Sequence, residues 1–259
     1  MKRLFVPPGT YEPCGLFGVE HLILLLASAA LITTALYFSR RMSFPQIRKT
    51  IWICTVILWI FEIIKIVFNL IVNGPDEPNH YIPLYFCSLT LYCGFMSAFG
   101  KGFVKRCGDT FLAVGSIIGG VMFLLCPNTS LPMYPFFHYI TFQSFLYHSI
   151  MIYLGILVIM RGYVVLRAKD QIPYGTVVLI VGVVAYLVNS VLGTNLMFVS
   201  DNFPGTPVEL VYRFTGRLFP LCMILIHIVP PFWVMYGISR LVEKRRRKAE
   251  KQQETPQGR

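Results

Sequence analysis

Long runs of apolar residues alternate with short polar stretches along nearly the whole chain. A helix needs about 20 mostly apolar residues to cross the hydrocarbon core of a bilayer. The pattern therefore predicts an all-α, polytopic membrane helix bundle with seven transmembrane helices. Their expected ranges are 16–38, 51–72, 82–99, 110–126, 138–160, 174–198 and 218–239. Glycines dilute the third and fourth ranges, and if only six helices exist we expect the fourth to be the missing one.

Composition agrees with a chain whose main solvent is lipid. Of its 259 residues, 55% are hydrophobic and 14% are charged, and the mean hydropathy is +0.62. The first apolar run begins near Leu16 and is too long and too late for a cleaved signal peptide, so we interpret it as a retained helix.

The basic residues predict the orientation. Eighteen of the 23 Lys and Arg residues fall in alternate loops and in the C-terminal tail, all on one side of the expected membrane. Because cytoplasmic loops are enriched in basic residues, we expect the N-terminus outside and the C-terminus in the cytoplasm. The layout is an outer segment (1–15), a membrane domain (16–239) and a basic, disordered cytoplasmic tail (240–259). Topology explains the net charge of +11 better than a nucleic-acid partner does.

No cofactor is implied by the motifs. The seven cysteines include no C-x-x-C pair, there is no glycine-rich phosphate loop, and no His/Asp cluster has metal-ligand spacing. Cys14 and Cys126 are both expected near the outer face, where a disulfide between them is one alternative to two free thiols.

Ionisable groups at bilayer depth are costly and need a reason. Glu62 and Lys65 are spaced i, i+3 and so share a helix face. They are either a buried structural ion pair or the wall of a polar cavity. His148 is expected near the middle of the membrane, where it either hydrogen-bonds one helix to another or transfers protons. His227 has the same two readings at a similar depth.

Cys87 should lie about a turn and a half below the outer surface. It is either a small packing residue or a nucleophile, and the second role would need a base such as His148. Asn189, Thr194 and Asn195, at the outer end of the sixth range, either bond helices together or line a headgroup pocket. A cavity open to the outer leaflet would explain the shared depth of these polar groups.

Three short motifs carry a resemblance to a known family: Ile82-Pro-Leu-Tyr-Phe-Cys87, Tyr147-His-Ser149 and Leu192-Gly-Thr-Asn-Leu-Met-Phe198. Together they resemble the YwaF-like family of bacterial integral membrane proteins. That family is grouped with the animal transmembrane protein 164 acyltransferases, which build ether phospholipids. The stretch Thr215-Gly-Arg-Leu-Phe-Pro220 departs from the aromatic-rich segment that the family often carries there.

The resemblance implies lipid acyl transfer or lipid-ester hydrolysis, with Cys87 as nucleophile and His148 as base. A more distant similarity to the androgen-induced membrane lipid hydrolases implies Thr90 or Ser88 as the nucleophile instead. The expected partners are membrane phospholipids, and Asn195 or Lys65 would stabilise the oxyanion.

Two other functions fit the same residues. The first is a small-molecule or ion transporter with a relay through Glu62, Lys65 and His148. The second is a non-enzymatic structural membrane protein whose polar groups only bond helices. In each case we expect a multi-pass protein, in a bacterial plasma membrane if the bacterial resemblance holds.

Overall fold

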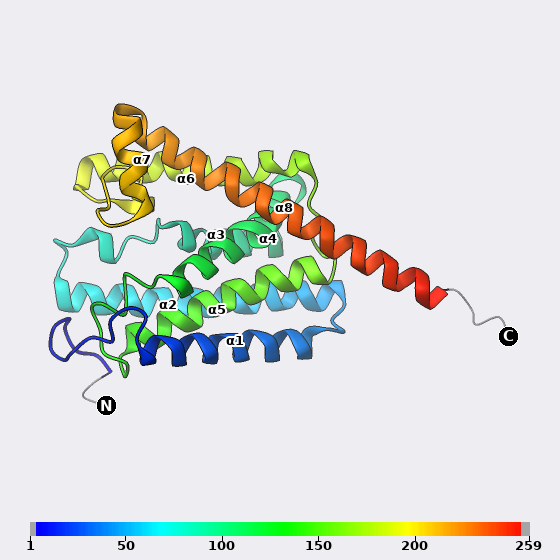
Figure 1. The fold of residues 1–259 in the computed structure, drawn as a ribbon, viewed down its shortest axis with the longest axis horizontal. Helices are drawn as coiled ribbons and strands as arrows, with labels where there is room; N and C mark the ends of the chain where they lie inside the picture. The colour runs from blue at the N-terminus through cyan, green and yellow to red at the C-terminus, as the bar shows by residue number, and fades with distance from the viewer. Residues whose placement is uncertain (1–3, 255–259) are drawn as a thin grey trace.

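The computed structural model describes residues 4–254, and these form an all-helical bundle (Figure 1). Six helices are long and apolar enough to cross a membrane. They are α1 (Val19–Ser39), α2 (Phe44–Asn73), α4 (Gly102–Leu125), α5 (Tyr139–Met160), α6 (Gln171–Leu192) and α8 (Phe219–Glu254). Two shorter helices, α3 (Leu89–Phe99) and α7 (Pro207–Thr215), complete the set of α-helices in the described part. The prediction of a polytopic helical membrane protein is confirmed.

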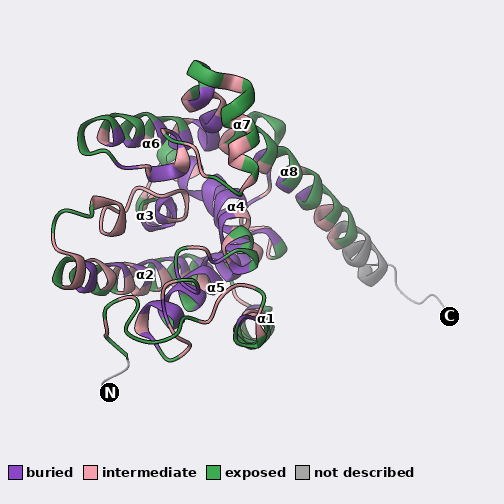
Figure 2. Ribbon diagram, turned by 60° about the vertical axis from the view of Figure 1, so that its left-hand side comes forward, coloured by how far each residue is buried: buried purple, intermediate pink, exposed green. Residues whose placement is uncertain are grey.

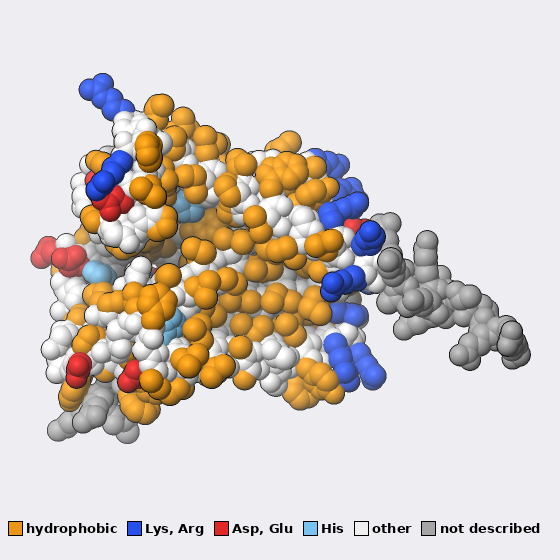
Figure 3. Space-filling view, viewed as in Figure 1, with side chains coloured by type: hydrophobic (Ala, Val, Ile, Leu, Met, Phe, Trp, Pro, Cys, Tyr) orange, Lys and Arg blue, Asp and Glu red, His pale blue; other side chains and the backbone are white. Residues whose placement is uncertain are grey.

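With the short α3 counted, helices α1 to α6 and then α8 run in alternate directions, so α1 begins and α8 ends at opposite ends of the bundle (Figure 1). Lysine and arginine side chains gather at the end from which α8 projects, whereas acidic side chains gather mainly at the other end (Figure 3). The predicted asymmetry of charge is therefore a property of the folded molecule. Which end faces the cytoplasm remains a prediction from that asymmetry.

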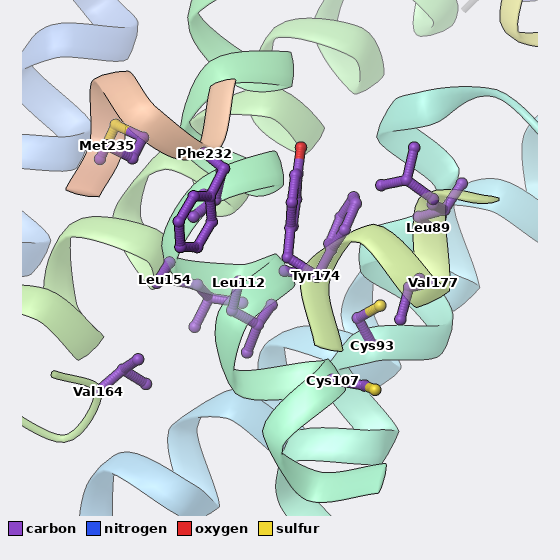
Figure 4. Close-up of a cluster of buried hydrophobic side chains, with 14 of the residues drawn as sticks. Leu89, Cys93, Cys107, Leu112, Leu154, Val164, Tyr174, Val177, Phe232 and Met235 are labelled. Carbon is purple, nitrogen blue, oxygen red and sulfur yellow. The ribbon is translucent and has the colours of Figure 1, made fainter. Parts of the chain in front are cut away.

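Helix α4 is the centre of the bundle, contacting α3, α5, α6 and α8, and its ribbon is mostly buried (Figure 2). Phe111 and Leu112 in its first half are fully buried. They belong to a core that includes residues from α3, α5, α6 and α8 (Figure 4). The glycines that weakened this range in the sequence allow close helix contact. A Cβ added at Gly108 would lie 2.4 Å from the backbone nitrogen of Ser97 in α3.

The third predicted helix is the short one. Residues 82–85 are not helical, and the helix begins with the 3₁₀ turn η2 (Phe86–Ser88), which leads directly into α3. Turn and helix comprise 3 and 11 residues, about 21 Å at about 1.5 Å per residue. This is less than the hydrocarbon thickness of about 30 Å. The preceding chain has partly buried side chains, as expected for irregular backbone enclosed by protein at this depth.

Helix α8 continues to Glu254 with Pro230 and Pro231 inside it. The helix thus extends through most of the segment 240–259 for which the charge pattern predicted disorder, and residues 255–259 lie outside the described residues. At the opposite end of the bundle, Cys14 and Cys126 are free thiols, so the alternative of a disulfide between them is not realised.

Candidate active site beside helix α4

Cys87 lies at the amino-terminal end of the short helix Phe86–Phe99. Its Sγ is 3.7 Å from the carbonyl oxygen of Gly119 in α4, to which the thiol donates a hydrogen bond. The side chain is partly exposed. The irregular chain before Phe86 is what sets the cysteine at a helix end inside the bundle.

His148 lies in α5 and is 7% exposed. Its Nδ1 is 2.7 Å from the carbonyl oxygen of Ser144, one turn earlier. A carbonyl oxygen can only accept, so Nδ1 carries the proton and Nε2 carries a lone pair. The ring stacks on Phe123 of α4, with centroids 3.7 Å apart and planes 5° apart. The imidazole is therefore fixed in the tautomer that a general base at Nε2 requires.

Both predicted catalytic residues contact α4 at adjacent positions. A Cβ added at Gly119 would lie 3.3 Å from Cys87 Sγ, and one added at Gly120 would lie 3.0 Å from the backbone oxygen of His148. The thiol itself is directed to Gly119, so it must rotate to transfer a proton to the imidazole.

Glu62 and Lys65 form the ion pair that their spacing predicted, with Lys65 Nζ 2.6 Å from Glu62 Oε1. The Glu62 side chain is 2% exposed and that of Lys65 is 25% exposed. The two charges touch, but Glu62 Oε1 receives no well-aligned hydrogen bond from the described residues. Lys65 thus presents part of its ammonium group outside the buried carboxylate.

Tyr147 was not expected in the site, although it precedes His148 in one of the three motifs. It is 4% exposed, and its hydroxyl is buried without a hydrogen-bond partner among the described residues. Tyr147 belongs to a packed cluster with Leu58 and Met151, and Cys87 packs against the same cluster. A tyrosine in an apolar helix is normally interpreted as packing, so only its position beside His148 could have marked it.

A space-filling view shows a hollow in the face between α5 and the helices α7 and α8 (Figure 3). It lies in the half of the bundle in which α1 begins (Figures 1 and 3). Its floor and walls are mainly apolar in colour (Figure 3), which suits a lipid chain better than a polar solute.

Comparison with known proteins decides the family. The family model for the TMEM164 family matches residues 16–236, most of the chain and all of its long apolar helices up to α8. The chain belongs to the TMEM164 family. No curated protein and no solved structure matched.

Membership of the TMEM164 family confirms the grouping that the three motifs indicated, and it supports a multi-pass membrane protein. The finer label of a YwaF-like bacterial protein, and with it a bacterial plasma membrane, remains a prediction. All three motifs lie inside the matched range, so the site described above belongs to the part of the chain that is shared with the TMEM164 family.

The family match also includes the polar residues after α6, and the structure gives them a local role. Asn189 is 3% exposed. Its Oδ1 accepts hydrogen bonds from the Thr194 hydroxyl (2.6 Å) and the Leu196 amide (2.9 Å). Its Nδ2 donates to the Leu196 carbonyl and the Ser200 hydroxyl. These bonds hold a loop, which we call the α6 knot (residues 189–201).

Asn195 bonds within the same knot. Its Oδ1 accepts from the amides of Ser200 and Asp201, and its Nδ2 donates to the Asp201 carbonyl. Because both the oxygen and the nitrogen of the Asn195 side chain are hydrogen-bonded within the loop, this side chain is not proposed as a donor to the oxyanion. Asn189, Thr194 and Asn195 hold the loop together and are not the open lining of a headgroup pocket.

The α6 knot supports the site indirectly. Phe198, inside it, has a left-handed backbone with φ 53°, and its ring centroid lies 6.0 Å from that of Tyr85, two residues before Cys87. The backbone N–H of Asn195 also donates a hydrogen bond to Asn79 Oδ1, and Asn79 lies in the segment that leads to Tyr85. Two of the three motifs that point to the TMEM164 family are therefore packed against each other.

The alternative nucleophiles are less accessible than Cys87. Thr90 is fully buried and its hydroxyl shares a hydrogen bond of 3.1 Å with Ser116 of α4. Ser88 is 5% exposed. His227 of α8 has the same type of backbone bond as His148, from Nδ1 to Met223, and its ring centroid is 5.2 Å from that of Phe86. The site thus has two imidazoles near its nucleophile, of which His148 is the one stacked on α4.

Proposed function

We propose that this protein carries out acyl transfer or ester hydrolysis on membrane phospholipids, with Cys87 as nucleophile and His148 as general base. One observation carries the proposal: His148 is locked with its lone pair on Nε2, and it borders α4 one residue from the glycine that Cys87 contacts. Membership of the TMEM164 family is consistent with a role in lipid chemistry.

In the first half-reaction the Cys87 thiol gives its proton to His148 Nε2, and the sulfur attacks the carbonyl carbon of a phospholipid ester. The carbonyl π electrons move to oxygen and form a tetrahedral oxyanion. Collapse of this intermediate breaks the bond from carbon to alkoxy oxygen, and the departing oxygen takes the proton back from Nε2. A thioester on Cys87 and a lysophospholipid result.

In the second half-reaction an alcohol or a water molecule gives its proton to His148 Nε2 and attacks the thioester. The bond from carbon to sulfur then breaks, and the thiolate recovers the proton from Nε2. An alcohol acceptor yields a new ester, whereas water yields a free fatty acid. The apolar walls of the hollow favour an alcohol that arrives from the membrane.

Lys65 and Glu62 would support the lipid rather than the reacting atoms. The partly exposed Lys65 ammonium suits a phosphate oxygen of the headgroup, and Glu62 holds that ammonium in place. Glu62 also balances the charge of Lys65 while no lipid is bound.

The test uses purified full-length protein in lipid nanodiscs with a phospholipid that carries an isotope-labelled acyl chain. We expect Cys87 to carry the label as a hydroxylamine-sensitive thioester in intact-mass and peptide spectra. Cys87→Ala should abolish both the adduct and turnover, whereas Cys222→Ala, another partly exposed cysteine, should change neither. Turnover by Cys87→Ala at the wild-type rate would reject the proposal.

A transporter is the second candidate, and the buried Glu62–Lys65 pair with its unbonded carboxylate oxygen favours it. In that case Glu62→Gln would abolish uptake into proteoliposomes while Cys87→Ala retained it. The acyl-transfer proposal gives the reverse order of effects in the turnover assay.

A further inference from the structure

We infer that the Tyr147 hydroxyl is a third catalytic group of this site, which donates a hydrogen bond to the oxyanion formed on the ester carbonyl. The inference rests on the proposed acyl transfer through Cys87 and His148 and adds the group that stabilises its intermediate.

The first argument is the state of the hydroxyl itself. Tyr147 is 4% exposed, and its Oη has no hydrogen-bond partner among the described residues. A buried polar atom without a partner destabilises the folded state, and such atoms are rare in native proteins. By contrast, Tyr153, on the same helix, uses its hydroxyl fully in a 2.6 Å hydrogen bond with Ser39. The unused donor of Tyr147 is best explained by a partner that arrives with the substrate.

The second argument is location. Cys87 packs against the cluster that contains Tyr147. Tyr147 directly precedes His148, so the backbone of α5 fixes the base and this donor in one rigid turn. A donor for the oxyanion must lie near the nucleophile without displacing the base, and Tyr147 meets both conditions.

The third argument excludes the donors that the sequence suggested. The Asn195 amide is bonded inside the α6 knot. The Lys65 ammonium lies against Glu62, and the proposed function assigns it to the headgroup phosphate instead of the ester carbonyl. Compared with these two groups, the neutral hydroxyl of Tyr147 has a hydrogen atom to donate and no partner among the described residues.

In the reaction this hydroxyl keeps its own proton. As sulfur bonds to carbon, the carbonyl oxygen gains the π electron pair, and the Tyr147 O–H shortens its hydrogen bond to that oxygen. When the intermediate collapses the electron pair returns, the leaving alkoxide takes its proton from His148, and the tyrosine is unchanged. The hydrogen bond strengthens only as negative charge develops, which is the condition for an effect on kcat.

The experiment compares Tyr147→Phe with Tyr153→Phe, both buried tyrosines of α5, in the nanodisc assay and in thermal unfolding. Removal of one oxyanion donor typically costs about a hundredfold or more in kcat. We expect that loss for Tyr147→Phe, with KM changed less than about twofold and a Tm equal to or above that of the wild type, since an unpaired polar atom is removed. Tyr153→Phe should lower Tm and leave kcat per folded molecule unchanged.

Two results would overturn the inference. The first is a kcat of Tyr147→Phe within about threefold of wild type while Cys87→Ala is inactive, which leaves the proposed function standing. The second is a fall in Tm for Tyr147→Phe that accounts for all of the lost activity. If Cys87→Ala itself keeps wild-type turnover, the proposed function fails and the role of Tyr147 fails with it.

Discussion

Two clusters of polar side chains lie toward the end of the bundle that carries the N-terminus, and they use their hydrogen-bonding groups very differently. In the α6 knot, the Asn189 side chain makes four hydrogen bonds, and Asn195 is bonded at both ends of its amide. Around Cys87, Tyr147 Oη and Glu62 Oε1 have no hydrogen-bond partner among the described residues. His148 bonds the protein through Nδ1, with Nε2 left as an acceptor.

This difference separates polar groups that build the fold from polar groups that await a ligand. A satisfied buried network stabilises one conformation, whereas each unsatisfied group destabilises it. The unpartnered hydroxyl of Tyr147 is costly for folding alone, and under the proposed function a substrate that bonds it explains its presence. Substitution in the knot should therefore damage stability, and substitution near Cys87 should damage activity.

The largest expected effect is on turnover, when the proposed general base His148 is replaced. His148→Gln should lower turnover by roughly a hundredfold to ten-thousandfold, the usual contribution of a general base, and should change Tm little. Initial rates with the labelled phospholipid and a thermal unfolding curve measure the two quantities. His227→Gln is the control because its Nδ1 makes the same backbone bond. A larger loss in His227→Gln than in His148→Gln would move the base to α8.

The second largest expected effect is on stability, when a hydrogen-bonding residue of the α6 knot is replaced. Asn189→Ala removes four hydrogen bonds from a buried loop and should lower the free energy of unfolding by about 2 to 4 kcal/mol. Equilibrium unfolding in detergent by tryptophan fluorescence would measure the change. Activity per folded molecule should stay near that of the wild type. A stable but inactive Asn189→Ala protein would contradict the division between the two clusters.

The third effect concerns the contact between Cys87 and α4. In Gly119→Ala the new Cβ would lie 3.2 Å from Phe86 and 3.3 Å from Cys87 Sγ. We expect the thiol to shift by a few tenths of an ångström and turnover to fall by about ten- to a hundredfold, since small misplacements are costly in catalysis. Gly182→Ala, which approaches Ile224 of α8 instead, should leave turnover unchanged. Equal turnover for both variants would show that the position of Cys87 is not limiting.

The smallest expected effect is on the pH dependence of stability, through His138 at the amino-terminal end of α5. His138 precedes α5, accepts the Ile140 amide at Nδ1 and bonds Val6 through Nε2. Burial lowers the pKa of His138 below its ordinary value of 6.5. The unfolded chain then binds more protons than the folded one, so this contribution to stability is present above about pH 6.5 and is lost as the pH falls.

The measurement is Tm at a series of pH values below 7 for the wild type and His138→Gln. The difference in Tm between them should shrink as the pH is lowered, because only the wild type has this buried histidine to protonate. A difference that is constant with pH would contradict the assignment.

The sequence predicted the helical membrane bundle well because a period of long apolar runs is a strong signal. Of the two glycine-containing ranges, it expected the fourth to be the missing helix, whereas the third is the one that is shortened. Hydropathy falls in α4 because of its glycines, yet those glycines let it become the most contacted helix. The range 82–99 is apolar throughout but contains a helix only from Phe86, since hydropathy does not distinguish helical from irregular enclosed chain.

For the site, the family resemblance supplied Cys87 and His148, and spacing supplied the pair Glu62 and Lys65. Tyr147 was missed because its meaning depends on an absent hydrogen bond, which no sequence pattern reports. Asn195 was misassigned for a related reason: an amide looks equally available in a sequence whether a loop consumes it or leaves it free. His21 of α1 is a further buried histidine that the hydropathy pattern does not single out: it is 2% exposed and bonds the Leu124 carbonyl at 2.8 Å.

The short helix also determines how a lipid must approach. Cys87 lies 12 residues from Phe99 at the basic end, about 18 Å at about 1.5 Å per residue, in a core about 30 Å thick. Its sulfur is therefore about 12 Å beneath the opposite boundary, where the esters of undisturbed lipids lie. Lys65, eight residues before Asn73, is at nearly the same depth. Under the proposed function, the protein acts on a phospholipid whose headgroup has sunk about 10 Å below its neighbours, and a leaflet that thins readily around the bundle lowers the work of that descent.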